Sequence, residues 1–481
     1  MKLPLIGYAP DLDPATPGVI TDCSAFISSV RGMEAAPSGV ITGLPALAAA
    51  CLGGASFRLL DNSQTTVAGT ASKLYTAGTT SWTDRSGAAT FVATTELRWS
   101  FAQYGNVTLA SNKADTIQAR TTGDFANAGA AAPKAAFIET VNDFIFAANV
   151  NDGADKPDGW HCSALGDYTD WTASIATQSA NGRLTDVPGP FTGLRRLNDN
   201  IVLYKRKAIY VGTYVGPDII WSFQLSSAEA GALNNNSIVN VNYAHYLMGD
   251  DDFYVFDGSR PVPIGGAIRR TVFSELDRTK LHLCSSLLDK ANSRIYFFYP
   301  NSSNGGYANR GVVYNYLTQR WGRHDISSEA SFLFVQAALT YDDLGTYYST
   351  YADFPNASYD TAFLGGASET PSYIDTSHVL RTLTGTPGAS QVTLGDLGND
   401  EEFFTLLRVK PRFLTSPTTG QMTNYYKNNE GDSYTQDVTT DISSSRFDVI
   451  RSARWHKLAF DFTGTVETPE LTIDAEIDGT E

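Results

Sequence analysis

The chain has 481 residues, of which 35 are Lys or Arg and 51 are Asp or Glu, so its formal net charge is −16 at pH 7. A free-standing nucleic-acid binder needs a basic surface that displaces counterions from phosphates, and docking on an anionic membrane needs one too. The charge balance therefore disfavours both classes of protein. With 42% apolar and 18% charged residues, 41 glycines, 25 Phe, 24 Tyr and 7 Trp, the composition is that of a globular chain rich in strands and turns.

The N-terminal residues do not have the pattern of a signal peptide. The apolar stretch 1–7 is short, is interrupted by Pro4, and runs into Asp11 and Asp13. The longest mildly apolar window, residues 40–55, contains glycines and a proline and is shorter than the roughly 20 residues of a spanning helix. We therefore expect a protein that has no membrane anchor and is made in the cytoplasm.

Short turns of Gly, Asn or Asp recur between runs of β-branched and aromatic residues. These residue types tolerate the positive φ that tight hairpins require. The turns lie at Gly53, Gly105, Asn142, Asn198, Asp251, Ala291 and Asp342. Their average spacing of about 48 residues agrees with a four-stranded propeller blade of roughly 40 to 50 residues. The pattern predicts an all-β protein with a six- or seven-bladed β-propeller over residues 23–395; stacked sandwiches and a β-solenoid are the alternatives.

Helical patterns are sparse, and the sequence pattern changes after about residue 395. One helix is predicted over residues 268–276, where four apolar residues share one face. Residues 395–400 form a polar, turn-rich junction of the kind that separates domains. We therefore predict a C-terminal β-sandwich over 396–481, or a sheet appended to the last blade, and an N-terminal extension over 1–22. The last stretch, 461–481, holds seven acidic residues and no Lys or Arg.

The acidic residues offer no specific catalytic or metal-binding pattern. Strand ends around a propeller axis could present the paired carboxylates of a glycosidase, but residues 81–84 and 166–171 do not match the Ser-x-Asp-x-Gly-x-Thr-Trp turn of sialidase-type propellers. The run 250–252 and the loop 151–159 carry oxygen ligands suited to calcium but lack the terminal Glu of a calcium loop. We read both as solvated turns and expect no enzymatic activity.

Cysteine and histidine patterns also predict no catalytic, cofactor or metal site. The four cysteines, Cys23, Cys51, Cys162 and Cys284, form no CxxC pair and are expected to be buried thiols. The six histidines show no HExxH spacing, and the adjacent His161 and Cys162 would point to opposite faces of a strand. Phosphate-binding glycine motifs and GxSxG are absent from the sequence.

Basic residues cluster in four places within this acidic chain. The simplest interpretation is solvated strand faces, and the alternative is patches that complement acidic surfaces of partners or of other copies of the chain. The clusters are Arg195 and Arg196; Lys205, Arg206 and Lys207; Arg269 and Arg270; and Arg446, Arg451, Arg454 and Lys457.

An ordered series of short strings resembles a known family. The series consists of residues 73–75, 82–87, 97–106, 111–118, 132–135, the strands around Asn142 and Asp143, 160–167, 170–171, 210–216, 249–258, 263–265, 314–316 and Trp321. In this order they look like the β-propeller tail hub or nozzle proteins of short-tailed bacteriophages, also described as packaged-DNA stabilisation proteins. The resemblance covers roughly residues 20–325 in register, continues more loosely through the C-terminal sandwich, and does not extend over 344–391.

The resemblance implies a non-enzymatic structural protein of the virion tail, assembled in the host cytoplasm. It implies a homo-oligomeric, hexameric ring below the portal, in contact with the adaptor or head-to-tail connector protein, tail fibres or tailspikes, and a tail needle or plug. Genomic DNA would be retained and later pass through the ring without sequence-specific binding. The acidic charge agrees with this, because a lumen that repels phosphate lets DNA slide. A glycan-binding or glycan-cleaving propeller, and an interaction propeller inside the cell, are the alternatives.

Overall fold

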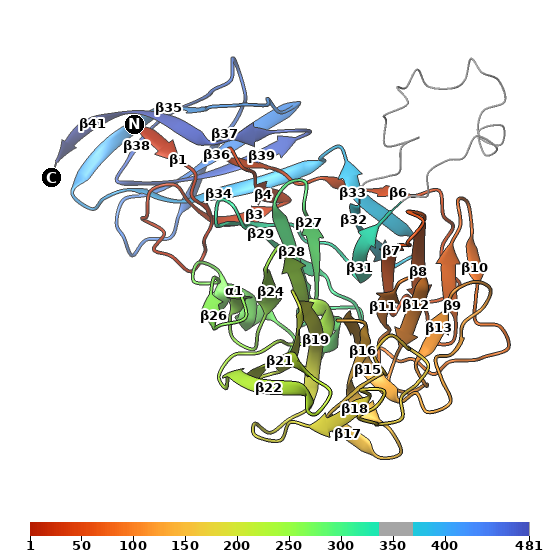
Figure 1. The fold of residues 1–481 in the computed structure, drawn as a ribbon. Helices are drawn as coiled ribbons and strands as arrows, with labels where there is room; N and C mark the ends of the chain where they lie inside the picture. Colours follow the sequence, from red (N-terminus) through yellow and green to blue (C-terminus); the bar gives the residue numbers. More distant parts are fainter. Residues whose placement is uncertain (336–368, 481) are drawn as a thin grey trace, which may run out of the picture.

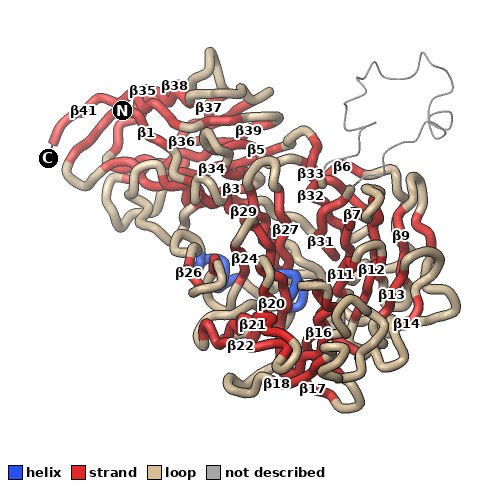
Figure 2. Tube along the Cα trace, in the orientation of Figure 1, coloured by secondary structure: helices blue, strands red, loops and turns tan. Residues whose placement is uncertain are grey.

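The computed structural model describes residues 1–335 and 369–480. The described residues form almost entirely strands and loops, arranged as a β-propeller and an adjoining β-sandwich (Figures 1 and 2). The predicted fold class is therefore confirmed.

Seven four-stranded antiparallel modules build the propeller. Blade one contains β7 (Gly53–Arg58), β8 (Gln64–Gly69), β9 (Leu74–Ala77) and β10 (Trp82–Asp84). Blade two contains β11 (Ser100–Tyr104), β12 (Val107–Ser111), β13 (Gln118–Arg120) and β14 (Ala126–Asn127). Blade three contains β15 (Lys134–Val141), β16 (Phe144–Asn151), β17 (Asp155–Cys162) and β18 (Ala180–Arg183). Blade four contains β19 (Phe191–Leu197), β20 (Asn200–Lys205), β21 (Ala208–Gly216) and β22 (Ile220–Ser227).

The remaining three blades complete the circle. Blade five contains β23 (Ile238–Val241), β24 (Ala244–Met248), β25 (Phe253–Phe256) and β26 (Pro261–Pro263). Blade six contains β27 (Ser285–Asp289), β28 (Arg294–Tyr299), β29 (Arg310–Asn315) and β30 (Arg320–Arg323). Blade seven contains β31 (Ser328–Phe334), β32 (Thr370–Asp375), β33 (Leu380–Gly385) and, from the N-terminal part of the chain, β6 (Ser38–Ile41).

The propeller closes because the first strand of each blade contacts the first strand of the next. β7, β11, β15, β19, β23, β27 and β31 follow one another in this way, and β31 contacts β7 again. Strand β6 completes blade seven through antiparallel pairing with β33, in which Val40 lies opposite Thr382. The blade number is therefore seven, and a strand from before blade one joins the last blade.

The predicted turns lie where the blades need them, with two exceptions. Gly105, Asn142 and Asn198 all have positive φ and connect the first two strands of blades two, three and four. Gly53 instead begins β7, and Asp251 lies between the second and third strands of blade five. The expected turn at Asp342 lies outside the described residues.

Two packed sheets form the sandwich. One has the order β1 (Lys2–Pro4), β41 (Glu470–Thr480), β35 (Glu402–Pro411), β38 (Phe447–Ala453). The other has the order β2 (Gly7–Tyr8), β3 (Val19–Ser24), β34 (Ala389–Gly398), β39 (Trp455–Thr463), β36 (Thr419–Lys427), β37 (Thr435–Asp441). Phe447 of one sheet meets Phe460 of the other, with ring centroids 5.6 Å apart.

The distribution of strands differs from the expected domain boundaries. Residues 2–24 form three strands of the sandwich and so are part of that domain, not an extension in front of the propeller. Strand β34 begins at Ala389 and pairs with β3 and β39, which places the start of the C-terminal sandwich segment before residue 396. Both differences arise because N-terminal strands pair with residues far along the chain: Lys2 lies opposite Thr472, and Ile20 lies opposite Leu394.

A seven-stranded sheet joins the two domains. It continues from β30 of blade six through β4 (Phe26–Ser28) and β5 (Met33–Ala35) to β40 (Glu467–Thr468). One apolar cluster likewise extends from Phe253 and Trp321 of the propeller to Leu406 and Phe460 of the sandwich. Propeller and sandwich therefore share both a sheet and a core.

The predicted helix is present as α1 (Arg269–Glu275), and two short 3-10 helices, η1 (Asn235–Ser237) and η2 (Leu281–Leu283), complete the helical elements of the described residues. The carboxylate of Asp11 accepts hydrogen bonds from the backbone N–H groups of Arg270 at 2.5 Å and Thr271 at 3.0 Å. An acid from the N-terminal segment therefore satisfies the free N–H groups at the start of the helix.

Candidate functional site: the axial cavity

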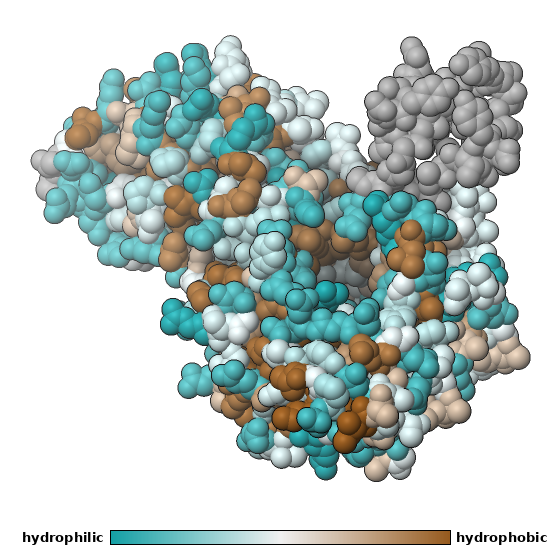
Figure 3. Space-filling view, in the orientation of Figure 1, coloured by the Kyte–Doolittle hydropathy of each residue, from teal (hydrophilic) through white to brown (hydrophobic). Residues whose placement is uncertain are grey.

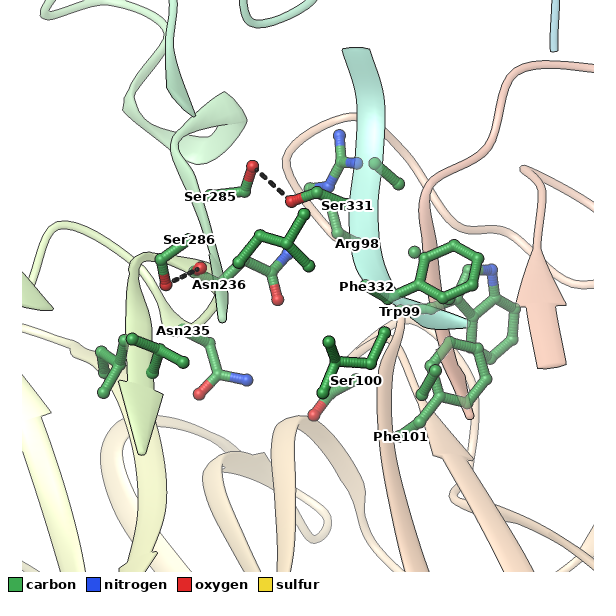
Figure 4. Close-up of a pocket in the computed structure, with 18 of the residues that line it drawn as sticks. Arg98, Trp99, Ser100, Phe101, Asn235, Asn236, Ser285, Ser286, Ser331 and Phe332 are labelled. Carbon is green, nitrogen blue, oxygen red and sulfur yellow. Dashed lines mark hydrogen bonds between the residues drawn. The ribbon is translucent and has the colours of Figure 1, made fainter. Parts of the chain in front are cut away.

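A cavity of about 600 Å³ lies on the propeller axis and is lined by the innermost strands of all seven blades (Figures 3 and 4). The cavity is lined by the innermost strands and the residues next to them, so their sequence decides the chemistry of the cavity. Most of the residues that line the cavity are uncharged, and both polar and apolar side chains are among them. The charged lining residues are Arg98, Glu139, Arg195, Arg196 and Glu329.

Glu139 of β15 and Arg195 of β19 face each other between blades three and four. The Oε2 atom of Glu139 lies 3.9 Å from Nη1 of Arg195, and Nη2 of Arg195 donates to the carbonyl oxygen of Asn235 at 2.9 Å. Burial raises the pKa of Glu139 above its usual value, and the charge of Arg195 partly offsets this effect. The carboxylate is therefore matched by a cation on the neighbouring blade.

Glu329 of β31 is held by three elements. Its carboxylate accepts from the backbone N–H of Cys51 at 2.8 Å and lies 2.8 Å from Nδ1 of His378, in the turn between β32 and β33. The guanidinium of Arg98 donates to the backbone carbonyl oxygen of Glu329. The second carboxylate of the cavity thus has its own partners, and neither acid is free to act as the partner of the other.

A smaller cavity of about 160 Å³ shares lining residues with the axial cavity. Arg98, Asn235 and Asn236 line both cavities, while Lys113 and His282 line only the smaller one. Lys113 is already engaged, because its Nζ donates to Asn149 at 2.5 Å and lies 2.9 Å from Asp155. The two cavities together bring cationic and amide donors to one end of the propeller axis.

The basic clusters noted in the sequence are mostly neutralised within the chain. Arg206 pairs with Asp250, Arg269 lies 3.3 Å from Asp252, and Arg451 lies 2.5 Å from Asp437. Lys205 is 1% exposed and donates to the carbonyl oxygens of Leu184 and Val187, so it is a core residue instead of part of a solvated strand face. Of these clusters, Arg195 and Arg196 are the residues that line the axial cavity.

The acidic side chains of the two segments considered for calcium have protein partners, and part of the second segment, residues 155–159, belongs to strand β17. Asp251 accepts from the hydroxyl of Tyr254 at 2.8 Å, and Asp252 accepts from the backbone N–H of Gly265 at 3.0 Å. In the loop 151–159, Asp152 pairs with Lys156, and Asp158 lies 2.7 Å from Arg183. Within residues 1–335 and 369–480, no group of three or more His, Cys, Asp or Glu side chains is arranged to hold a metal ion.

The four cysteines are buried free thiols, as the sequence predicted. His161 and Cys162 do point apart: Nε2 of His161 lies 2.9 Å from the carbonyl oxygen of Trp171, while Cys162 packs in the apolar cluster between blades three and four. Burial raises the pKa of the Cys162 thiol to about 12, which keeps it in the unreactive protonated form.

Sequence reasoning did not single out Arg98, Glu139, Asn235 or Glu329. A partial signal was available for Glu139, because it lies three residues before the turn at Asn142, at the same offset as Arg195 before Asn198. In blades three and four, a charged residue three positions before the first turn therefore marked the innermost strand. Arg98 and Glu329 had no such marker.

No model of a known protein family matches this sequence, and no curated protein sequence is significantly similar to it. Solved structures with a similar arrangement include the computationally designed Ika8 protein (10% identity, 72% of this chain and 99% of that chain, TM-score 0.39). Others are YCF48 from Cyanidioschyzon merolae (9%, 72% and 98%, TM-score 0.38) and the exo-beta-1,3-galactanase from Phanerochaete chrysosporium in complex with galactose (9%, 85% and 100%, TM-score 0.29). None of these three is a phage tail protein, and at these TM-scores the similarities carry no argument about function.

No helix among the described residues has both the length and the apolar character needed to cross a membrane.

Proposed function

We propose that this chain is a structural subunit of the tail hub or nozzle of a short-tailed bacteriophage. In this role it forms a hexameric ring in the virion tail, continues the DNA channel below the portal and the adaptor protein, and retains the packaged genome until ejection. The ordered series of strings between residues 73 and 321 supports the proposal at the level of sequence.

The observation that carries the proposal is the continuous sheet between propeller and sandwich. A ring subunit under the pressure of packaged DNA has to keep its domains in one fixed arrangement, and a hinge between them would work against this. Here β4 and β5 pair with β30 on one side and β40 on the other. Arg31, in the turn between β4 and β5, pairs with Glu467 of β40, whose carboxylate also accepts from Ser29 at 2.8 Å.

The distribution of charge supports the part of the proposal that concerns DNA. Residues 389–481 contain 16 acidic and 8 basic side chains, so this fifth of the sequence carries half of the net charge of −16. Asp474, Glu476 and Asp478 of β41 are exposed, and Asp474 lies 3.6 Å from Arg408. A surface of this kind facing the bore would repel phosphate and leave the DNA free to move.

The first test is the oligomeric state of the full chain. We expect electron micrographs of the purified protein, alone or mixed with the adaptor protein of the same phage, to show six-fold rings with an open bore. Mass photometry should give the corresponding mass. A monomer at every concentration, including in the presence of the adaptor, would contradict the proposal, as would glycan binding or glycan cleavage by the isolated chain.

The second test separates the charge argument from the ring. Asp474→Lys, Glu476→Lys and Asp478→Lys together should convert a ring that does not retain double-stranded DNA at physiological salt into one that does, with retention falling as salt is raised. The matched control reverses three exposed acids of the propeller, Asp199, Asp218 and Glu229, and should leave DNA retention unchanged. If both triple variants retained DNA equally, the acidic residues of β41 would not face the bore.

A further inference from the structure

We propose that strand β22 is an interaction edge, through which two copies of this chain associate by antiparallel pairing of their β22 strands about a two-fold axis. The contact joins the four strands of blade four to the same four strands of the second copy. Because a two-fold contact cannot close a six-fold ring, this association is additional to the proposed ring, and either one can fail without the other.

The outer edge of β22 is unpaired. This strand, Ile220–Ser227, is the last of blade four and lies at the rim of the propeller (Figure 1). Its inner edge pairs with β21 in unbroken register from Trp221, opposite Tyr214, to Leu225, opposite Tyr210. No strand within residues 1–335 and 369–480 pairs with the outer edge. Every second residue along such an edge directs a backbone N–H and C=O outward, where an added strand can bond to them.

The other outer strands of the described blades are protected in ways that β22 lacks. Strands β6, β10, β14 and β18 have only two to four residues each. Strand β26 has three residues, of which Pro261 and Pro263 cannot donate a backbone bond, and β30 is covered by β4. In contrast, β22 has eight residues and contains no proline and no charged side chain. Proteins normally protect a free edge by one of these means, so a long edge without them is suited to pairing.

The side chains of β22 complement themselves in an antiparallel pair. Trp221, Phe223 and Leu225 alternate with Ser222 and Gln224, so one face of the strand is apolar and the other is polar. When the two-fold axis lies at Phe223, the whole unbroken stretch pairs with its copy. Phe223 then lies opposite Phe223 of the second copy, Trp221 opposite Leu225, and Ser222 opposite Gln224. Phe223 is half-buried and Leu225 is 39% exposed, so the pairing removes apolar surface from water.

A second copy of the chain fits this edge better than a charged partner does. The strand has no charge that could attract an acidic or a basic peptide. The hairpin that leads into β22 adds two more exposed apolar side chains, Val215 and Ile219. In a two-fold pair every backbone bond and every side-chain contact is made twice, so a strand that complements itself is the simplest occupant.

The test is sedimentation equilibrium of the full chain over a range of concentrations. We expect the mass of the basic unit, whether subunit or ring, to double with a Kd of about 100 µM or tighter. The two Gln224 side chains are diagonal neighbours across the axis, about 7 to 8 Å apart. Gln224→Lys and Gln224→Glu should therefore each weaken the doubling about fivefold, because like charges then meet. An equimolar mixture of these two variants should associate at least as well as the parent chain, because opposite charges then meet.

The matched control is Gln436→Lys, at an exposed glutamine of β37, the edge strand of the sandwich. It should leave the association unchanged. The proposal is overturned if the mass does not double at the highest concentration, which would leave the edge to a strand of a different protein. It is also overturned if Gln224→Lys and Gln436→Lys have equal effects, or if the mixture associates no better than its components.

Electron micrographs of dilute samples separate this contact from those of the ring. Rings should form equally well from the parent chain, Gln224→Lys and Gln436→Lys, and a loss of rings in Gln224→Lys alone would contradict a separate two-fold contact. The Gln224 side chain is exposed and forms no hydrogen bond within the described part of the chain, so its substitution should leave the fold intact. Thermal unfolding of each variant checks this before the association is compared.

Discussion

Arg294 of β28 donates through Nη2 to the carboxylate of Glu34 in β5 at 2.5 Å, and through Nε to the carbonyl oxygen of Ser28 at 2.9 Å. Arg294 is 3% exposed, whereas the Glu34 side chain is 28% exposed. The interaction links blade six to the strand pair that continues toward the sandwich. It is a partly buried contact at the place where the two domains join.

Replacing Arg294 by Met should therefore destabilise the whole chain. The substitution leaves the Glu34 carboxylate and the Ser28 carbonyl without their donor, and breaking such a pair from one side costs roughly 2 to 4 kcal/mol in the free energy of unfolding. Urea unfolding followed by tryptophan fluorescence measures this loss. The double variant Arg294→Met, Glu34→Gln should recover part of the stability, since no charge is left unpaired. A loss below about 0.5 kcal/mol in the single variant would rule out a structural role for the pair.

Closure of blade seven can be tested at Thr42, directly after β6. Its backbone N–H donates to the carbonyl oxygen of Leu380 at 3.1 Å, and its hydroxyl lies 3.2 Å from the same oxygen. Thr42→Pro removes the N–H and should lower the free energy of unfolding by roughly 1 to 3 kcal/mol. Thr42→Ala keeps the N–H and should cost clearly less. Equal effects of the two substitutions in thermal unfolding would show that the backbone bond does not hold the closing strand.

Stability should fall as the pH is lowered from 6.5 toward 4. Burial lowers the pKa of His245, His324 and His456 to about 4 each. In the unfolded chain these groups take up a proton near pH 6.5. The unfolded state therefore binds more protons in this window, and each group removes about 1.4 kcal/mol per pH unit below 6.5 until the folded state is protonated as well. The stability contributed by the neutral imidazoles is fully present above pH 6.5.

His245 gives the most direct test of this pH dependence. Its Nε2–H donates to the carbonyl oxygen of Arg196 at 2.9 Å, since a carbonyl only accepts, and so Nδ1 accepts from the hydroxyl of Tyr204 at 2.6 Å. In His245→Gln, unfolding between pH 6 and 5 should take up about one proton fewer than in the parent chain. The slope of the unfolding free energy against pH should decrease by about 1.4 kcal/mol per pH unit. Unfolding of the same variant at pH 7.5 gives the cost of the substitution itself. An unchanged slope would mean that His245 does not titrate differently in the two states.

Local signals in the sequence predicted the repeated part of the fold well. Asn142 and Asn198 occupy positive-φ positions in the first hairpins of their blades, and helix α1 lies within the predicted residues 268–276. The closing strand β6 and the N-terminal strands of the sandwich were not predicted. Val40 pairs with Thr382, and Lys2 pairs with Thr472. Pairing over such separations leaves no periodic trace in either segment, because each strand alone has the same alternating pattern as any other.

The candidate site was less predictable than the fold. Arg195 was noted as part of a basic cluster, but its partner Glu139 comes from another blade, and the two are neighbours only because the ring is closed. Arg98 lies in a loop and Asn235 begins the short helix η1, and neither stands out when the sequence is read along the chain. Both line the axial cavity, which exists only because the seven innermost strands are brought together in the closed ring.

Strand β6 and the first strands of the sandwich come from the N-terminal part of the chain. This affects when the fold can be completed during synthesis. Strands β1, β3, β4 and β6 all pair with residues beyond position 320. At 5 to 20 residues per second, the first 41 residues wait on the order of 15 to 95 s on the ribosome before their partners have been synthesised. Until then blade seven and the sandwich have unpaired edges, which invite wrong pairing. The propeller is thus completed only after β33 has been made and the sandwich only after β41, so a chain that stops before these strands would lack a finished surface for assembly with other subunits.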